Sequence, residues 1–120
     1  MSSPLPIERL QHIRDEALYL LECRPLFATQ QALQNDKHIS RAVVRSLEII
    51  GEATKNLPAD WRSTYPAVAW REVARMRDKP THHYFDIDFA FVWSVLHEEL
   101  DTLLATVEQM IRDLAPGGPA

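Results

Sequence analysis

The sequence predicts an all-α protein, an up-and-down bundle of four main helices that form a single domain over residues 1–120. Apolar residues recur at three- and four-residue spacing over long stretches, no stretch alternates as a strand does, and prolines stand where the helical stretches end. With 46% hydrophobic and 25% charged residues, the chain has the composition of a globular protein with a core of its own. We expect an ordered core over about residues 7–114.

The first helix is expected from about Pro6 to Arg24, because Pro25 lacks a backbone N–H and restricts the residue before it. The spacing of its apolar residues predicts a buried stripe: Leu10, Ile13, Ala17, Leu20 and Leu21. The following segment, 25–35, is ambiguous, although residues 29–34 could form a short helical turn.

The second helix is expected from about Asp36 to Leu57, with a cap residue at its start. Its apolar face consists of Ile39, Val43, Leu47, Ile50 and Thr54. Beside that face runs a row of charged residues, at spacings of three and four, that are neighbours on the helix: Arg41, Arg45, Glu48, Glu52 and Lys55. This charged row is either a solvated face with surface salt bridges or a polar stripe that faces a cleft or a second subunit.

A loop is expected over residues 61–69, followed by a third, shorter helix over residues 69–78 that Pro80 stops. The last helix is expected over residues 88–114, with Asp86 and Asp88 as candidate N-caps. It has the longest apolar stripe of the chain: Phe89, Val92, Leu96, Leu100, Leu103, Val107, Met110 and Leu114. A straight helix of this length measures roughly 40 Å, which suggests an antiparallel neighbour or a dimer partner.

Residues 76–86 concentrate cations, imidazoles, carboxylates and a phenol between the third and last helices. Arg77 carries a guanidinium fork that matches phosphate oxygens, and His82 can exchange a proton near neutral pH. A phosphate clamp beside a proton-transfer group suffices for RNA cleavage without a metal, in which the 2′-hydroxyl attacks the adjacent phosphate. Lys79 and His83 could add charge neutralisation or a second proton relay.

Other interpretations of these residues remain open. Arg77 could interact with a helix C-terminus, and either histidine could be hydrogen-bonded at a turn. Tyr84 and the phenylalanine after it could form a core aromatic pair. Four neighbouring residues could also bind a metal, namely His82, His83, Asp86 and Asp88, but they lack the spacing of a helical zinc motif. We expect no metal and no cofactor.

The net charge of −4 and the pI of about 5.7 argue against a protein that coats nucleic acid nonspecifically. A local basic site remains compatible with these values, because four cations lie within nine residues: Arg71, Arg75, Arg77 and Lys79. Cys23 is the only cysteine and cannot form an internal disulfide, which favours a reducing cytoplasm. No apolar run is long enough for a membrane span, and no targeting motif is present in this sequence.

The segment Arg77-x4-His82-His83-Tyr84 has the pattern R-x4-H-x-Y. Together with Leu47–Ala53, which has the sequence LEIIGEA, and with Trp70-Arg71-Glu72, it resembles the HepT-like toxins of the HEPN superfamily, which are small all-helical proteins. The resemblance covers roughly residues 7–112.

This resemblance implies a homodimer whose two motifs line a shared cleft, and a metal-independent ribonuclease toxin that acts on RNA such as tRNA or mRNA. It implies that Arg77 and His82 are the catalytic pair and that a nucleotidyltransferase antitoxin silences the toxin by transferring AMP to Tyr84. Asp78, where relatives often have Asn, is then a supporting residue, as are Lys79 and His83. The alternatives are a non-catalytic helical module that docks a nucleotidyltransferase or a nucleotide, and a metal-dependent hydrolase.

Overall fold

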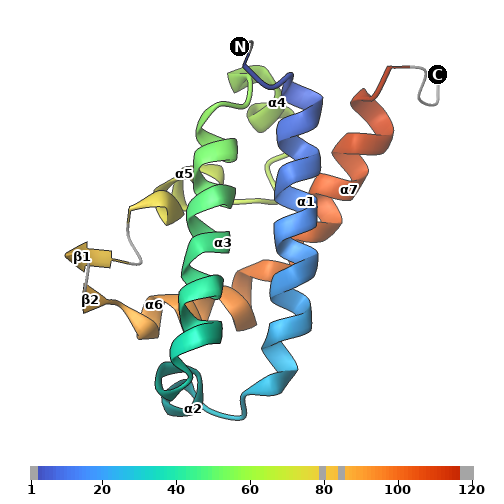
Figure 1. Ribbon diagram of the computed structural model, residues 1–120. Coiled ribbons are helices and arrows are strands. Elements are labelled where there is room, and N and C mark those ends of the chain that lie inside the picture. Colours follow the sequence, from blue (N-terminus) through green and yellow to red (C-terminus); the bar gives the residue numbers. More distant parts are fainter. Residues whose placement is uncertain (1–2, 79–80, 84–85, 117–120) are drawn as a thin grey trace.

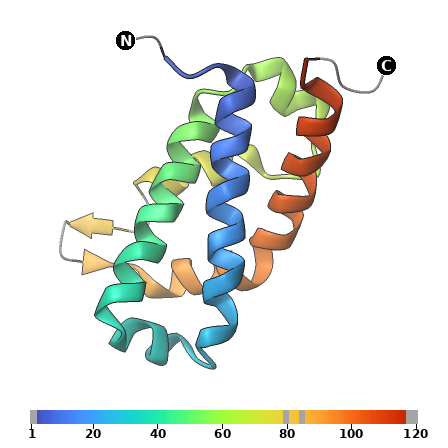
Figure 2. The same ribbon diagram turned by 45° about the vertical axis from the view of Figure 1, so that its right-hand side comes forward.

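The computed structural model describes residues 3–78, 81–83 and 86–116, with the backbone alone for 81–83 and 86. Three long helices provide most of the core, namely α1 (Pro6–Cys23), α3 (Lys37–Lys55) and α7 (Leu100–Leu114). The helix α1 packs against both α3 and α7 and stands between them in both views (Figures 1 and 2). The predicted all-α class is confirmed. Among the described residues, no helix is long and apolar enough to cross a membrane.

The boundaries of α1 and α3 follow from local capping. The backbone N–H of Leu5 donates to Glu8 Oε1 at 2.7 Å at the start of α1, and Asp36 Oδ1 accepts from the N–H of Ile39 at 2.9 Å at the start of α3. The predicted stripes face the core, and the following residues are fully buried: Leu10, Ile13, Ala17, Leu20, Val43, Leu47, Ile50 and Thr54. Leu21 and Ile39 lie at the edges of the stripes and are only partly buried.

Short helices connect the long ones. After the 3-10 turn η1 (Arg24–Leu26), α2 (Gln30–Asn35) confirms the helical turn expected near residues 29–34. The expectation of a loop over 61–69 is wrong in its first part, because α4 (Ala59–Thr64) occupies it. Pro58 precedes α4 as its N-cap, and the fixed φ of proline suits the start of a helix. The expected third helix is α5 (Trp70–Ala74), followed by the 3-10 turn η2 (Arg75–Arg77).

A two-stranded antiparallel hairpin follows η2, with β1 at Thr81–His83 and β2 at Asp86–Ile87. The sequence did not predict it, since strands of three and two residues are too short to show apolar alternation. Asp86 therefore belongs to a strand and not to a helix cap. Asp88 does cap the next helix, because its Oδ1 accepts from the N–H of Phe91 at 3.0 Å.

The last helical segment is bent, and the expectation of one straight rod of roughly 40 Å is wrong. It consists of α6 (Phe89–Ser94), a π-helical turn η3 (Val95–Glu99) and α7. Figure 1 shows α6 crossing the lower part of the bundle and α7 rising beside α1. The N–H of Leu100 donates to Val95 O, five residues back, and such π turns often bend a helix. The length of this segment therefore gives no argument for a dimer.

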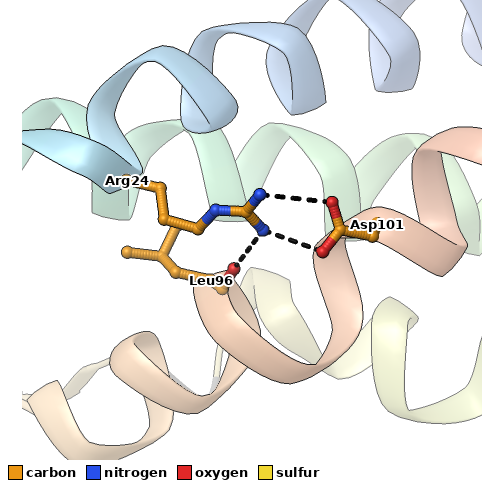
Figure 3. A network of polar contacts seen from close by, with 3 residues as sticks. All are labelled: Arg24, Leu96 and Asp101. Carbon is orange, nitrogen blue, oxygen red and sulfur yellow. Dashed lines mark hydrogen bonds and ion pairs between the residues drawn. The ribbon is translucent and has the colours of Figure 1, made fainter.

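Arg24 joins the end of α1 to this bend (Figure 3). Its Nη1 donates to the backbone oxygen of Leu96 at 3.1 Å and to Asp101 Oδ2 at 2.9 Å, and its Nη2 donates to Asp101 Oδ1 at 3.3 Å. The hydrogen bond from Arg24 lowers the pKa of the Asp101 carboxyl below its ordinary value, although partial desolvation opposes this. One guanidinium thus binds both a backbone carbonyl of the π turn and a carboxylate of α7.

Candidate active site around Arg77

Gly51 of α3 allows the backbone of η2 to approach the helix closely. A Cβ atom at Gly51 would lie 2.9 Å from the carbonyl carbon of Met76 and 3.0 Å from the Cα of Arg77, and closer still to the Arg77 nitrogen. Side chains do not tolerate such contacts with backbone atoms, so this packing requires glycine. Because the Met76 side chain is buried in the core, the backbone position of Arg77 is set by packing on both sides of the turn.

Glu52, the next residue of α3, pairs with the Arg77 side chain. Glu52 Oε2 lies 2.9 Å from Arg77 Nη1, and each side chain is 47% exposed. The pair lacks the angular geometry of a good hydrogen bond. A guanidinium has five N–H donors, and within the described part of the chain the Arg77 side chain has no other polar partner. The described residues therefore leave most of its donors without a partner.

Arg77 lines two cavities. The first has a volume of about 340 Å³ and lies along α1 and α3. Its polar lining consists of Arg9, His12, Arg45, Glu48, Glu52 and Arg77. The three central members of the charged row on α3 line this cavity, namely Arg45, Glu48 and Glu52. Arg45 Nη1 also lies 3.9 Å from Glu48 Oε2 in a surface ion pair, so both interpretations of the row apply in part.

The second cavity has a volume of about 620 Å³ and lies between the C-terminal end of α3, α4 and α5. Its charged lining consists of Lys55, Arg62, Arg71, Arg75, Arg77 and Asp78. We call it the basic cavity. The structure thus brings together three of the four cations that the sequence grouped, while Lys79 lies outside the described residues.

The other predicted site residues are described only in part. His82 is the middle residue of β1, five positions after Arg77, and His83 is the last; their backbones are described and their side chains are not. Tyr84 lies outside the described residues. Where side chains are described, no three His, Cys, Asp or Glu residues cluster as metal ligands do. The alternative metal site is not tested by this, since three of its four residues have no described side chain.

Sequence reasoning missed the contribution of α1 and α4. Arg9 and His12 line the first cavity, and Arg62 lines the basic cavity. His12 is exposed. Its three-residue spacing from Arg9 places both on one side of α1, but only the packing of α1 against α3 brings that side to the cavity.

Residues 14–110 match a protein family described as "Ribonuclease HepT-like". The chain belongs to this family. The match covers most of the helical core, from α1 to α7, and includes Gly51, Arg77 and the hairpin. The resemblance inferred from the motif is thereby confirmed at the level of the family.

Three relatives illustrate the range of similarity within the HepT-like family. A candidate RNase of Caldanaerobacter subterraneus subsp. tengcongensis is 38% identical over 112 residues, which are 93% of this chain and 97% of that protein. A candidate RNase of Methanocaldococcus jannaschii is 44% identical over 79 residues, 66% of this chain and 65% of that protein. A protein of Thermococcus cleftensis named "Probable ribonuclease HepT" is 45% identical over 75 residues, 62% of this chain and 68% of that protein. No solved structure gives a significant match.

Proposed function

We propose that this protein is the ribonuclease toxin of a toxin–antitoxin pair and that it cleaves RNA without a metal ion, with Arg77 and His82 as the catalytic pair. One observation carries the proposal. Packing of η2 on Gly51 holds Arg77 at the wall of two cavities, and the strand that contains His82 begins four residues later. The names of the relatives support the same reaction class.

The reaction uses groups that the chain and its substrate supply. The 2′-oxygen of a ribose loses its proton and forms a bond to the adjacent phosphorus. The bond from phosphorus to the 5′-oxygen breaks, and this oxygen leaves with the electron pair and takes up a proton. The products are a 2′,3′-cyclic phosphate and a 5′-hydroxyl. Arg77 binds the non-bridging oxygens as negative charge develops, and His82 transfers one of the two protons near neutral pH.

Cleavage in excess EDTA tests this proposal. Unmodified protein is expected to cleave RNA at the same rate with and without EDTA and to leave the matching DNA strand intact, because DNA lacks the 2′-hydroxyl. Product ends are read by mass spectrometry. Activity that EDTA abolishes and a divalent cation restores would instead support the metal-dependent hydrolase. A chain that cleaves nothing but binds a nucleotidyltransferase would support the non-catalytic module.

The proposal includes regulation by AMP transfer to Tyr84. The phenolic oxygen of Tyr84 would attack the α-phosphorus of ATP, and pyrophosphate would leave. The support is the position of Tyr84 in the motif, two residues after His82 and seven after Arg77. An anionic adduct there would repel RNA and compete for the guanidinium. The nucleotidyltransferase antitoxin and the homodimer belong to the same proposal, and both rest on the family.

Intact mass tests the regulatory step. Protein produced together with the cognate nucleotidyltransferase is expected to gain mass in AMP units and to lose cleavage activity, whereas the Tyr84→Phe variant gains none and stays active. Tyr19→Phe, a change in a half-buried tyrosine of α1, is the matched control and is expected to gain AMP like the wild type. A mass gain that persists in Tyr84→Phe would move the modification to another residue.

A further inference from the structure

We propose that the basic cavity binds the phosphodiester backbone of a single RNA strand and leads that strand to Arg77. The inference rests on the proposed function, because it assigns a substrate path to the same site. It adds binding residues on the end of α3 and on α4, which the sequence did not indicate, to the cations Arg71 of α5 and Arg75 of η2, which it did.

The charge of the basic cavity indicates an anionic ligand. Five of the 13 lysines and arginines of the chain line it, against one carboxylate, although the chain as a whole carries a net charge of −4. Two of the five are paired, Arg75 with Glu72 at 3.4 Å and Arg77 with Glu52 at 2.9 Å. The other three have no side-chain polar partner within the described residues: Lys55, Arg62 and Arg71. Like charges gathered without counterions attract a polyanion.

Arg62 provides the strongest single observation. Its Nε atom is buried, yet it has no hydrogen-bond partner among the described residues. Buried N–H donors of folded proteins almost always have an acceptor, so Arg62 stands out in the cavity wall as a cation whose charge the described residues leave unpaired. An arginine in a cationic cavity fits a phosphate oxygen well, and no carboxylate of the described residues forms an ion pair with Arg62.

The walls of the basic cavity suit a nucleotide chain better than a free inorganic anion. Trp70, Ala59 and Ala74 also line the cavity and contribute apolar surface. The Trp70 ring is held in place because its Nε1 donates to the backbone oxygen of Tyr65 at 2.8 Å. A ribose or base can contact such a surface while the phosphates on either side meet arginines. Contacts of this kind position a strand without reading its sequence.

Arg77 connects this path to the chemistry. Among the described residues, only Arg77 lines both the first cavity and the basic cavity. A strand that lies in the basic cavity and reaches the first cavity therefore passes the guanidinium of Arg77. This continuity favours RNA as the ligand of the basic cavity. An acidic protein surface has no phosphate to be cleaved, so its binding would not require a cavity that leads to Arg77.

The test measures binding without cleavage. A labelled 2′-O-methyl RNA strand keeps its phosphates but lacks the attacking hydroxyl, so its affinity for the full, unmodified chain can be measured by fluorescence anisotropy over a series of salt concentrations. The test variant is Arg71→Gln/Arg75→Gln, in which both residues are exposed. The control variant is Arg14→Gln/Arg112→Gln, which removes the same charge from the α1–α7 surface. Arg62→Gln tests the buried donor, and circular dichroism verifies that each variant is folded.

The test variant is expected to raise the dissociation constant roughly tenfold or more and to reduce the salt slope by about 0.7 for each phosphate that the variant no longer neutralises. Arg62→Gln is expected to weaken binding too, whereas the control variant binds like the wild type. Equal affinities of test and control variants would overturn the inference, even if the wild type cleaves RNA. The inference would also be overturned if the test variant kept its RNA affinity but no longer formed a complex with a nucleotidyltransferase. RNA binding that depends on the basic cavity, in a protein that cleaves no RNA, would support the inference and overturn the proposed function.

Discussion

Replacing Arg77 with alanine is expected to slow RNA cleavage by about 10²–10³-fold, the usual effect of removing a group that binds charge developing in the transition state. His82→Ala is expected to cost about 10²–10⁴-fold, because it removes a proton-transfer group. Arg77→Lys should restore only part of the activity, since an ammonium keeps the charge without the planar fork. Single-turnover cleavage rates at saturating protein are the measurement.

The fold should survive the Arg77→Ala change. The ion pair with Glu52 is half exposed, and such pairs contribute at most about 1 kcal/mol. Arg41→Ala is the matched control, because Arg41 is an exposed arginine of α3 in neither cavity, and it is expected to cleave RNA like the wild type. Wild-type rates in both Arg77→Ala and the double variant His82→Ala/His83→Ala would show that the site is assigned wrongly. The double variant removes both imidazoles, so His83 cannot take over proton transfer from His82.

Gly51→Ala is expected to destabilise the protein and to reduce cleavage at the same time. Inside an ordinary helix, alanine is favoured over glycine by about 1 kcal/mol. Here the added methyl group would overlap backbone atoms of Met76 and Arg77, which cannot rotate away as a side chain can. We expect a net loss of about 1–3 kcal/mol in the free energy of unfolding, because η2 must move away from α3. Urea unfolding and the cleavage rate measure the two effects.

Ala42→Gly provides the control for this change. Ala42 lies in α3 and is only partly buried, so glycine there should cost about 1 kcal/mol in helix propensity and leave cleavage unchanged. A Gly51→Ala variant that is more stable than the wild type would contradict the close contact between α3 and η2. A variant that is destabilised but fully active would separate this contact from the position of Arg77.

Local periodicity was sufficient to predict the all-α class and the core faces of α1 and α3. Residues such as Leu10, Ile13, Val43 and Leu47 repeat at helical spacing, and that spacing depends on nothing outside the helix. The bend after α6 was not predictable in this way, since apolar residues continue on both sides of it. Its π turn is held by Arg24, more than seventy positions earlier in the chain. The hairpin was missed because its strands are too short to show a period.

The sequence alone also led to the HepT-like family and to Arg77, His82 and Tyr84 as its motif residues. It did not show why Gly51 stands in α3, because the reason is the backbone of η2 packed against it. Nor did it show that Arg9 and His12 of α1, or Arg62 of α4, share cavities with Arg77. Hydrophobic spacing reports which face of each helix is buried. Which polar residues of different helices meet at one surface depends on how the helices pack, and that packing is a property of the folded chain.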